Sequence, residues 1–559
     1  MELQFVLTLI VLVTSAQCEV YTSVVETDIG PVRGRYLYTT TELKQFSAFL
    51  GIPYAEPPLG DLRFANPVPH RGWSDVFNAT EDSLAVCPQY IISGVFGQED
   101  CLTLNVYTPA VKFPNPDKPY PVMIWIYGGA FLCGANHRIF YGPDLLIEDD
   151  VIVVAMNYRL GPLGFMSLGI KDCPGNQGLK DQRLAMQWVQ RNIAKFGGDP
   201  NLVTIFGESA GSASTSYHLM SHNSRGLFHR VILQSGTPLC TWTYQTERYA
   251  TMKAQELAKR TGILDTDPEQ ILEKLKNTEL HEIMNAAADM GSVIYRVEAN
   301  FPFVPTTESA DPDEAVITEC PLSYFESGDV ADVPIMLGYN HNEAILFTAV
   351  PDDVQRIIFN EISSGLNLAG LNFAADFAQL ATNITGSSFG DLTYMITTYF
   401  FRSPIDLSQQ MLARRNSDKP VFYYQLSYSV PTNLHRFFEP TLSGTSHIDD
   451  IGQIFQTFGS PIDPYNPENV RRKQFVKLWT NFAKYGNPTP PGKSDVVWLD
   501  SKSGGLQMQL EFNNFHMTPR EIDEDSVNFV QKPFIKTLPI LQNCRNNILE
   551  GFNIFDTIL

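Results

Sequence analysis

Basic side chains are scarce in this chain of 559 residues. Lysine and arginine together number 40 against 61 aspartates and glutamates, so the formal net charge is −21. A surface of that sign repels the phosphates of nucleic acids and of anionic lipid heads. We therefore expect no nucleic-acid partner. The charge does not bear on the fold, and the sequence leaves the oligomeric state open.

Long apolar runs are scarce as well. One lies at the N-terminus, where the mostly apolar stretch Phe5–Val13 is followed by the small residues Ala16 and Cys18. This order is typical of a secretory signal peptide, and the run is too short to span a membrane. We expect residues 1–18 to be a signal peptide, the mature secreted chain to begin at Glu19, and no integral membrane anchor. The alternative is an N-terminal core strand.

The sequence contains no C-x-x-C pair, so a zinc cage is not expected. If Cys18 leaves with the signal peptide, seven of the eight cysteines remain, and an odd number leaves at least one thiol free or paired outside the chain. Cys87 and Cys101 close a short loop and are the best candidates for a disulfide; two buried free thiols are the alternative. In a secreted chain, Asn78 (N-A-T) and Asn383 (N-I-T) are glycosylation acceptors.

Internal repeats and low-complexity tracts are absent from the sequence too, and what is present is an alternation of strand-like and helix-like segments. Short β-branched apolar runs, which suit central strands covered on both faces, occur at Val122–Ile126, Val151–Ala155, Leu202–Phe206, Val231–Gln234, Val333–Leu337 and Val421–Leu426. Helical patterns between them include Gln182–Phe196 and the segment of Phe475 and Phe482 that ends at Gly486. Alternation of this kind predicts an α/β fold with a large, mostly parallel sheet. We expect residues 19–559 to be one domain with helical insertions at 247–300 and 352–403.

The strongest local motif is Gly207-Glu208-Ser209-Ala210-Gly211, a G-x-S-x-G pattern. It directly follows the expected strand Leu202–Phe206 and precedes a segment, Ser212–Met220, that can be helical. In that context the motif predicts a sharp strand-to-helix turn that exposes a nucleophilic Ser209. The helix N-terminus behind the serine stabilises negative charge.

A serine hydroxyl needs a base within hydrogen-bond reach and an acid behind that base. Chain order in this architecture places the acid and then the histidine after the serine. Glu343 follows the strand Val333–Leu337, and His447 lies on a loop after Val421–Leu426. Sequence chemistry alone leaves four other histidines open as the base: His218, His222, His229 and His281.

A third element is the small-residue loop Tyr127-Gly128-Gly129-Ala130-Phe131, at the end of the strand Val122–Ile126. Consecutive small residues let backbone N–H groups point at one spot. Together with the N–H of Ala210, they can form an oxyanion hole. A simple turn is the alternative for the two glycines.

These motifs resemble the type-B carboxylesterase/lipase family, which includes cholinesterases, bile-salt-activated lipases and insect juvenile hormone esterases. The resemblance rests on V-M-I-W-I-Y-G-G-A-F-L-C-G at 122–134, N-Y-R-L-G at 157–161, P-G-N-Q-G-L-K-D-Q-R at 174–183, the stretch 196–211 and E-D-C-L at 99–102. It runs from Val25 to about Asp500. It implies an α/β-hydrolase fold and an acyl-enzyme mechanism that needs no metal or cofactor.

Carried over residue by residue, the resemblance implies that Ser209 is the nucleophile, Glu343 the acid and His447 the base. It implies that the backbone N–H groups of Gly129, Ala130 and Ala210 bind the oxyanion. The remaining carried-over roles are an acidic neighbour of the nucleophile (Glu208), a buried serine that supports the histidine and acid (Ser235), a disulfide (Cys87–Cys101) and a buried structural ion pair (Arg159–Asp181). Asp449 and Asp450, just after His447, instead suit the first turn of a helix.

The departures from the family pattern narrow the range of expected substrates. Cholinesterases carry a tryptophan inside the first cysteine loop, and residues 88–100 here contain none. Cation–π recognition of choline is therefore missing at that point, and we do not expect a cholinesterase. Glu208 stands where many juvenile hormone esterases have Gln. We expect a secreted esterase for small apolar esters; the alternatives are a catalytically silent adhesion or binding protein and a lipase that acts on lipid aggregates.

Overall fold

The computed structural model describes residues 21–82, 85–91, 94–113, 118–290, 301–348, 393–394, 396–415, 417–437, 443–503 and 505–520. The expected signal peptide, the glycosylation acceptor Asn383 and most of the expected insertion at 352–403 lie outside these residues.

Thirteen strands of the described part form one sheet, and twelve of them follow a single path. In spatial order they are β1 (Tyr21–Glu26), β2 (Pro31–Tyr38), β3 (Gln45–Pro53), β7 (Thr103–Thr108), β9 (Ile152–Met156), β8 (Tyr120–Ile126), β10 (Gly198–Glu208), β11 (Arg230–Gln234), β12 (Ile335–Asn340), β13 (Val421–Leu426), β14 (Leu506–Leu510) and β15 (Phe515–Pro519). β4 (Phe77–Asn78) pairs with β2, and β5 (Gln89–Ile91) and β6 (Gly94–Phe96) form a separate hairpin.

The centre of the sheet is parallel and its margins are antiparallel. Pairing is parallel from β9 through β8, β10, β11, β12 and β13 to β14. β1, β2, β3, β7 and β9 pair antiparallel at one margin, and β14 and β15 at the other. The six apolar runs predicted as central strands all lie in the parallel part, which confirms the mostly parallel α/β sheet.

The strand boundaries follow local chemistry. β13 coincides with the predicted Val421–Leu426. β12 begins at Ile335, two residues later than predicted. Pro334 precedes it and has no N–H to donate to a neighbouring strand, which accounts for the later start.

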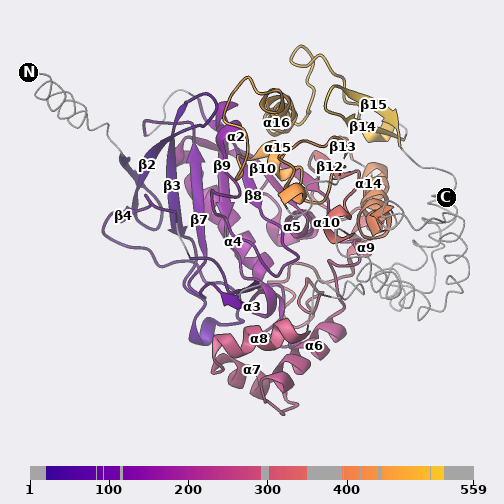
Figure 1. The fold of residues 1–559 in the computed structure, drawn as a ribbon. Coiled ribbons are helices and arrows are strands. Elements are labelled where there is room, and N and C mark those ends of the chain that lie inside the picture. The colour runs from indigo at the N-terminus through magenta and orange to yellow at the C-terminus, as the bar shows by residue number, and fades with distance from the viewer. Residues whose placement is uncertain are drawn as a thin grey trace, which may run out of the picture.

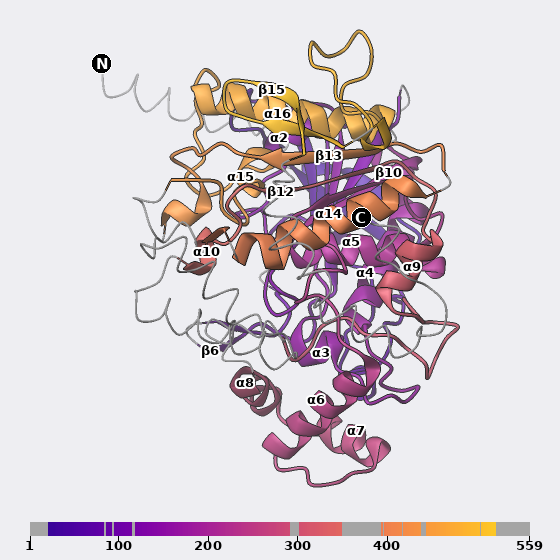
Figure 2. The same cartoon turned by 90° about the vertical axis from the view of Figure 1, so that its right-hand side faces the viewer.

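Helices cover both faces of the sheet (Figures 1 and 2). α2 and α16 lie on one face, and α4, α5 and α14 lie on the other (Figure 2). The helices of the described part are α2 (Asp144–Glu148), α3 (Gly161–Phe165), α4 (Gln177–Asn192), α5 (Ala210–Met220), α6 (Glu247–Arg260), α7 (Pro268–Lys276), α8 (Leu280–Met290), α9 (Pro321–Ser327), α10 (Ile345–Thr348), α14 (Ser403–Arg414), α15 (Ile451–Ile454) and α16 (Pro467–Tyr485). Short 3-10 turns occur at η1 (Gly60–Leu62), η2 (Ile193–Phe196), η3 (His222–Ser224), η5 (Leu434–Phe437) and η6 (Ser501–Ser503), and η4 (Thr398–Arg402) is a π-helical turn.

Two predicted helices show what sequence patterns capture. α16 ends where predicted, with Gly486 in the left-handed conformation at φ 68°. α4 begins at Gln177, five residues earlier than predicted. Its first turns hold polar side chains that are buried because they are paired: Asp181 bonds Arg159 at 2.7 Å and Lys180 bonds Glu308 at 2.5 Å. The first pair confirms the expected structural ion pair.

The expected insertion at 247–300 is helical over its described part. α6, α7 and α8 form a lobe at the lower end of Figure 1, away from the sheet. Between 352 and 403 the described residues contribute η4 and the start of α14. No helix in the described part of the chain is long and apolar enough to cross a bilayer.

Cys87 and Cys101 form a disulfide, as expected. Cys320 is disulfide-bonded too, whereas Cys133, Cys173 and Cys240 are free.

Candidate active site

Ser209 lies at the turn between β10 and α5, near the carboxyl ends of the central strands. Its backbone has φ 59° and ψ −125°, a conformation that non-glycine residues rarely adopt. Its N–H donates to Gln234 O on the neighbouring strand at 2.8 Å, which holds the turn in place. The predicted sharp turn is therefore present, and the serine side chain is 7% exposed.

The small residues on either side of Ser209 are required by close backbone contacts. A Cβ on Gly211 would lie 1.9 Å from Ile126 O, and one on Gly207 would lie 2.5 Å from the backbone of Gly211. Neither distance is physically accessible, so the strand, the turn and the helix can approach this closely only through glycine.

Glu343 and His447 reach Ser209 from two other strand ends. Glu343 follows β12 by three residues, and His447 lies on the loop between β13 and α15. The two loops are joined because His447 N donates to Glu343 O at 3.0 Å and Asn342 N donates to Thr445 O at 3.0 Å.

Ser209, His447 and Glu343 form one continuous hydrogen-bonded chain. Ser209 Oγ lies 2.8 Å from His447 Nε2, and His447 Nδ1 lies 2.7 Å from Glu343 Oε2. The second carboxylate oxygen, Oε1, accepts the N–H of Asn340 at 2.7 Å. Because the acid occupies Nδ1, the other ring nitrogen is the one available to take a proton from the serine.

The four histidines that sequence chemistry had left open as the base (His218, His222, His229 and His281) all lie elsewhere. His218 is buried, and both of its ring nitrogens bond other side chains. Burial lowers its pKa to about 3. His222 and His281 are exposed, and His229 Nδ1 accepts the N–H of Val203. Of these five histidines, His447 is the one that is hydrogen-bonded to Ser209 in the described part of the chain.

The loop after β8, which the sequence predicted as an oxyanion-binding loop, has a strained backbone. Gly129 has φ 107°, and Ala130 and Phe131 have φ 57° and 61°. Among the described residues, neither Gly129 nor Ala130 donates its backbone N–H to a protein acceptor. A Cβ on Gly129 would lie 2.0 Å from Cys133 O, so this position requires glycine.

Glu208 gives the imidazole a second carboxylate. Its Oε1 lies 3.2 Å from His447 Nε2, the nitrogen that also faces the serine. Burial raises the pKa of Glu208, and the charge of His447 opposes that rise. Burial alone would lower the pKa of His447, but the neighbouring carboxyl groups of Glu208 and Glu343 outweigh it and raise that pKa above its usual range. The site therefore favours positive charge on the imidazole, which is the charge that proton transfer from Ser209 would create.

Ser235 is buried, as the family resemblance implied, but its hydroxyl does not bond the acid or the histidine. Its Oγ has no hydrogen-bond partner among the described residues. Ser235 contacts the neighbouring strand β12 through its backbone, since Ser235 N donates to Gly338 O at 2.9 Å. Asn340 instead contacts both loops: its N–H donates to Glu343, and its Nδ2 donates at 2.8 Å to Ser446 O, next to His447.

Asp449 and Asp450 lie just before a helix, close to where the sequence placed them, but both side chains have partners that the sequence did not indicate. Asp450 is the residue before α15, but its side chain makes no capping hydrogen bond. Both side chains are at most 1% exposed and bond other side chains: Asp450 accepts Gln234 Nε2 at 2.6 Å, and Asp449 accepts His435 Nδ1 at 2.7 Å. α15 has only four residues, so burial in polar networks outweighs any interaction with its dipole.

Two aromatic residues next to the site were not predicted. The Phe401 ring lies 4.7 Å from the imidazole of His447, measured between ring centroids. Trp242 donates its indole N–H to Phe400 O at 3.1 Å and packs against Phe401. The π-helical turn η4 belongs to the insertion whose sequence pattern is weakest, so only the structure brings these residues to the site.

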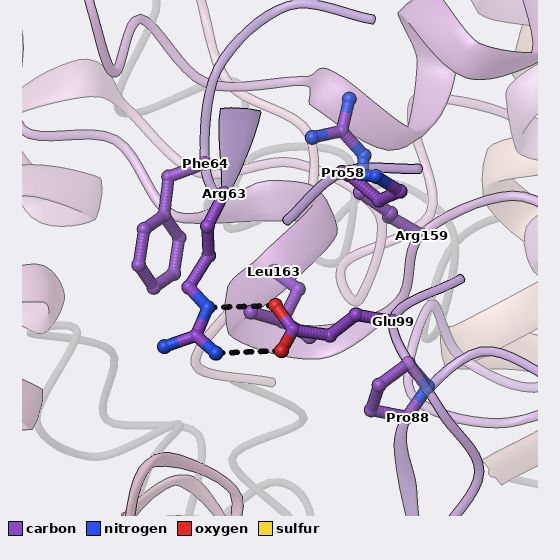
Figure 3. A pocket seen from close by; sticks show the side chains of 7 residues that line it. All are labelled: Pro58, Arg63, Phe64, Pro88, Glu99, Arg159 and Leu163. Atoms are coloured by element: carbon purple, nitrogen blue, oxygen red, sulfur yellow. Dashed lines mark hydrogen bonds and ion pairs between the residues drawn. The ribbon is translucent and has the colours of Figure 1, made fainter. Parts of the chain in front are cut away.

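Figure 3 shows a pocket elsewhere that presents no unpaired charge. Pro58, Arg63, Phe64, Pro88, Glu99, Arg159 and Leu163 line it. Arg63 forms a two-point ion pair with Glu99, and Arg159 is held by Asp181. These ion pairs stabilise the fold beside the disulfide. None of the expected catalytic or oxyanion-hole residues lines this pocket. Within the described ranges, no group of three or more His, Cys, Asp and Glu side chains is placed to hold a metal ion.

Comparison with known proteins agrees with this geometry. Residues 21–530 match the Carboxylesterase family. The chain is 34% identical to Esterase FE4 of Myzus persicae over 85% of its own length and 86% of that protein's. It is 33% identical to the juvenile hormone esterase of Tribolium castaneum, over 88% of this chain and 89% of that one, and 33% identical to the acetylcholinesterase of Bungarus fasciatus, over 85% and 80%.

These relatives are named for ester hydrolysis, and the family match includes the serine motif and the whole sheet. The chain belongs to the carboxylesterase family of α/β-hydrolases and is a carboxylic-ester hydrolase.

Proposed function

We propose that Ser209, His447 and Glu343 carry out a two-step acyl transfer on small apolar esters. In the first step His447 Nε2 takes the Ser209 proton, and Oγ forms a bond to the ester carbonyl carbon. His447 then returns that proton to the departing alkoxide, and the acyl group remains on the serine. In the second step His447 takes a proton from water, the resulting hydroxide attacks the acyl group, and the acid leaves as Ser209 regains its proton.

The observation that carries this proposal is the unbroken chain of hydrogen bonds from Ser209 Oγ through His447 to Glu343. In it Glu343 keeps the imidazole in the tautomer whose Nε2 is free to accept. The backbone N–H groups of Gly129, Ala130 and Ala210 are proposed to stabilise the oxyanion, which in comparable sites is worth a factor of about 10² to 10³ for one donor. No step requires a metal or a cofactor.

Ser209→Ala tests the assignment. Turnover of a nitrophenyl ester should fall by at least about 10⁴-fold, and labelling by a fluorophosphonate probe should disappear. Probe labelling that persists at another serine would contradict the assignment. A catalytically silent binding protein, the alternative of another class, would show neither turnover nor labelling in the unmodified chain.

The substrate is proposed to be a neutral, small ester rather than a choline ester. The loop closed by the Cys87–Cys101 disulfide contains no tryptophan that could hold a quaternary ammonium. A panel of short-chain and long-chain nitrophenyl esters, together with acetate, juvenile hormone and choline esters, tests this directly. Preference for long chains presented as aggregates would favour the lipase alternative.

We also propose that the chain is secreted as one domain, residues 19–559, after removal of residues 1–18. The disulfide supports an oxidising compartment. Asn78 is exposed and so accessible to glycosylation, and Asn383 is proposed as a second acceptor. N-terminal sequencing of protein from the culture medium should begin at Glu19, and glycosidase treatment should lower its mass.

A further inference from the structure

A second imidazole–carboxylate pair lies beside the loop that carries His447. His435, in η5, donates Nδ1 to Asp449 Oδ2 at 2.7 Å, and both side chains are 1% exposed. The proposed acyl transfer uses neither residue. A buried pair of this kind costs free energy of desolvation unless its remaining hydrogen-bonding groups are also satisfied, so the other contacts of Asp449 show what it holds.

The Asp449 carboxylate clamps the turn that contains His447. The same oxygen, Oδ2, accepts Ser446 N at 2.6 Å and Asn433 Nδ2 at 2.9 Å. Burial raises the pKa of Asp449, and the His435 hydrogen bond opposes that rise. His435 therefore helps to keep the Asp449 carboxylate negatively charged. By accepting Ser446 N, this carboxylate links the residue before His447 to the second residue after it.

The clamped turn is strained. Ile448, between His447 and Asp449, has φ 69°. A β-branched residue in the left-handed region is an outlier, and such conformations persist only where surrounding contacts over-determine them. Asp449 is one of the contacts that hold the turn in this conformation, because its carboxylate ties Ser446 N to His435 in η5.

The contacts on the side of the acid do not replace this clamp. His447 N and Asn342 N tie the base loop to the acid loop through backbone bonds. Asn340 Nδ2 also bonds Ser446 O, and Asp450 accepts Gln234 Nε2, but of these contacts only the Asp449 carboxylate ties the N–H of Ser446 to η5. The ring must stay 2.8 Å from Ser209 Oγ and 2.7 Å from Glu343 at once, so small rotations of this turn break the chain.

We propose that His435 and Asp449 are positioning residues for His447: the pair holds the strained 446–449 turn so that the imidazole bridges Ser209 and Glu343. This inference rests on the triad proposed above. It predicts that loss of the His435 donor slows the chemical step and leaves ester binding nearly unchanged, because neither residue contacts Ser209 or the oxyanion loop in the described structure.

His435→Leu tests the inference, with His435→Asn as the rescue variant. Asn can place an amide N–H where Nδ1 lies, whereas Leu removes the donor. For Leu we expect kcat to fall about 10- to 100-fold, the range for a catalytic group displaced by about 1 Å, with KM changed less than threefold. The rate of fluorophosphonate labelling at Ser209 should fall in parallel, and Asn should restore most of both. The matched control is His222→Leu, which breaks a surface histidine–aspartate pair with Asp329 (2.8 Å) and should leave kcat unchanged.

The outcomes are separable. Unchanged kcat in folded His435→Leu overturns the inference. If Leu prevents folding, His435→Gln decides, because its longer side chain carries the amide to the position of Nε2 rather than Nδ1. Asn active and Gln impaired supports the inference, whereas equal activity of the two overturns it. Activity that survives Ser209→Ala would instead refute the proposed triad.

Discussion

Replacing Glu343 with glutamine tests the triad at its acid, because the structure determines which way the new amide must face. Glu343 uses both oxygens: Oε2 meets His447 Nδ1 at 2.7 Å, and Oε1 accepts Asn340 N at 2.7 Å. The side chain is fully buried. An amide at this position must keep its oxygen toward Asn340 N, since a buried N–H without an acceptor costs about 1–3 kcal/mol. Its NH₂ group then faces Nδ1.

That orientation reverses the tautomer of the His447 imidazole. A donor facing Nδ1 forces the ring proton onto Nε2, and Nε2 can no longer accept the proton of Ser209. Loss of the acid in a triad of this kind costs on the order of 10³- to 10⁴-fold in kcat, or about 4–5 kcal/mol in the activation free energy. KM and the fold should change little, because the amide has the same size as the carboxylate.

The assay is steady-state hydrolysis of a nitrophenyl ester at matched folded fraction, measured by near-UV circular dichroism. Asp450→Asn is the control: Asp450 is equally buried but bonds Gln234 and Asn340 rather than the imidazole, so its loss should be far smaller. If Glu343→Gln keeps kcat within tenfold of the unmodified enzyme, or if Asp450→Asn is as damaging, Glu343 is not the acid.

Three further predictions concern the turn, the disulfide and the pH profile. Gly211→Ala should abolish folding or activity, because its methyl would lie 1.9 Å from a backbone carbonyl of β8; Gly452→Ala, whose methyl meets nothing within 4 Å, should be tolerated, and thermal melts distinguish them. The double Cys87→Ser/Cys101→Ser variant should lose about 3 kcal/mol of unfolding free energy in urea titrations, since the disulfide closes a loop of 14 residues, and an unchanged midpoint would contradict this. Glu208→Gln removes a charge that raises the pKa of the catalytic imidazole, so the acid limb of kcat/KM should move to lower pH; a limb that stays or rises would count against that charge.

The sheet was predictable because a parallel central strand must be apolar on both faces. Runs such as Val421–Leu426 show this pattern in the sequence itself. The start of α4 was not predictable by the same logic. Lys180 and Asp181 are polar in sequence and buried in the fold, because Glu308 and Arg159 reach them from distant segments. Pairing partners of this kind have no local signature.

By itself the sequence determined the strand–turn–helix context of Ser209, the small residues that the turn requires and the chain order of serine, acid and base. These are local properties, set by backbone sterics within a few residues. Residue chemistry left several histidines open, and the tertiary structure decided which one meets the serine. His218 lies in α5 and bonds Ser224 and Gln182, whereas the loop after β13 brings His447 to Ser209 Oγ. The tertiary structure also decided the roles of Asp449 and His435, since a carboxylate's function follows from the donors that surround it once it is buried, and those donors come from separate loops.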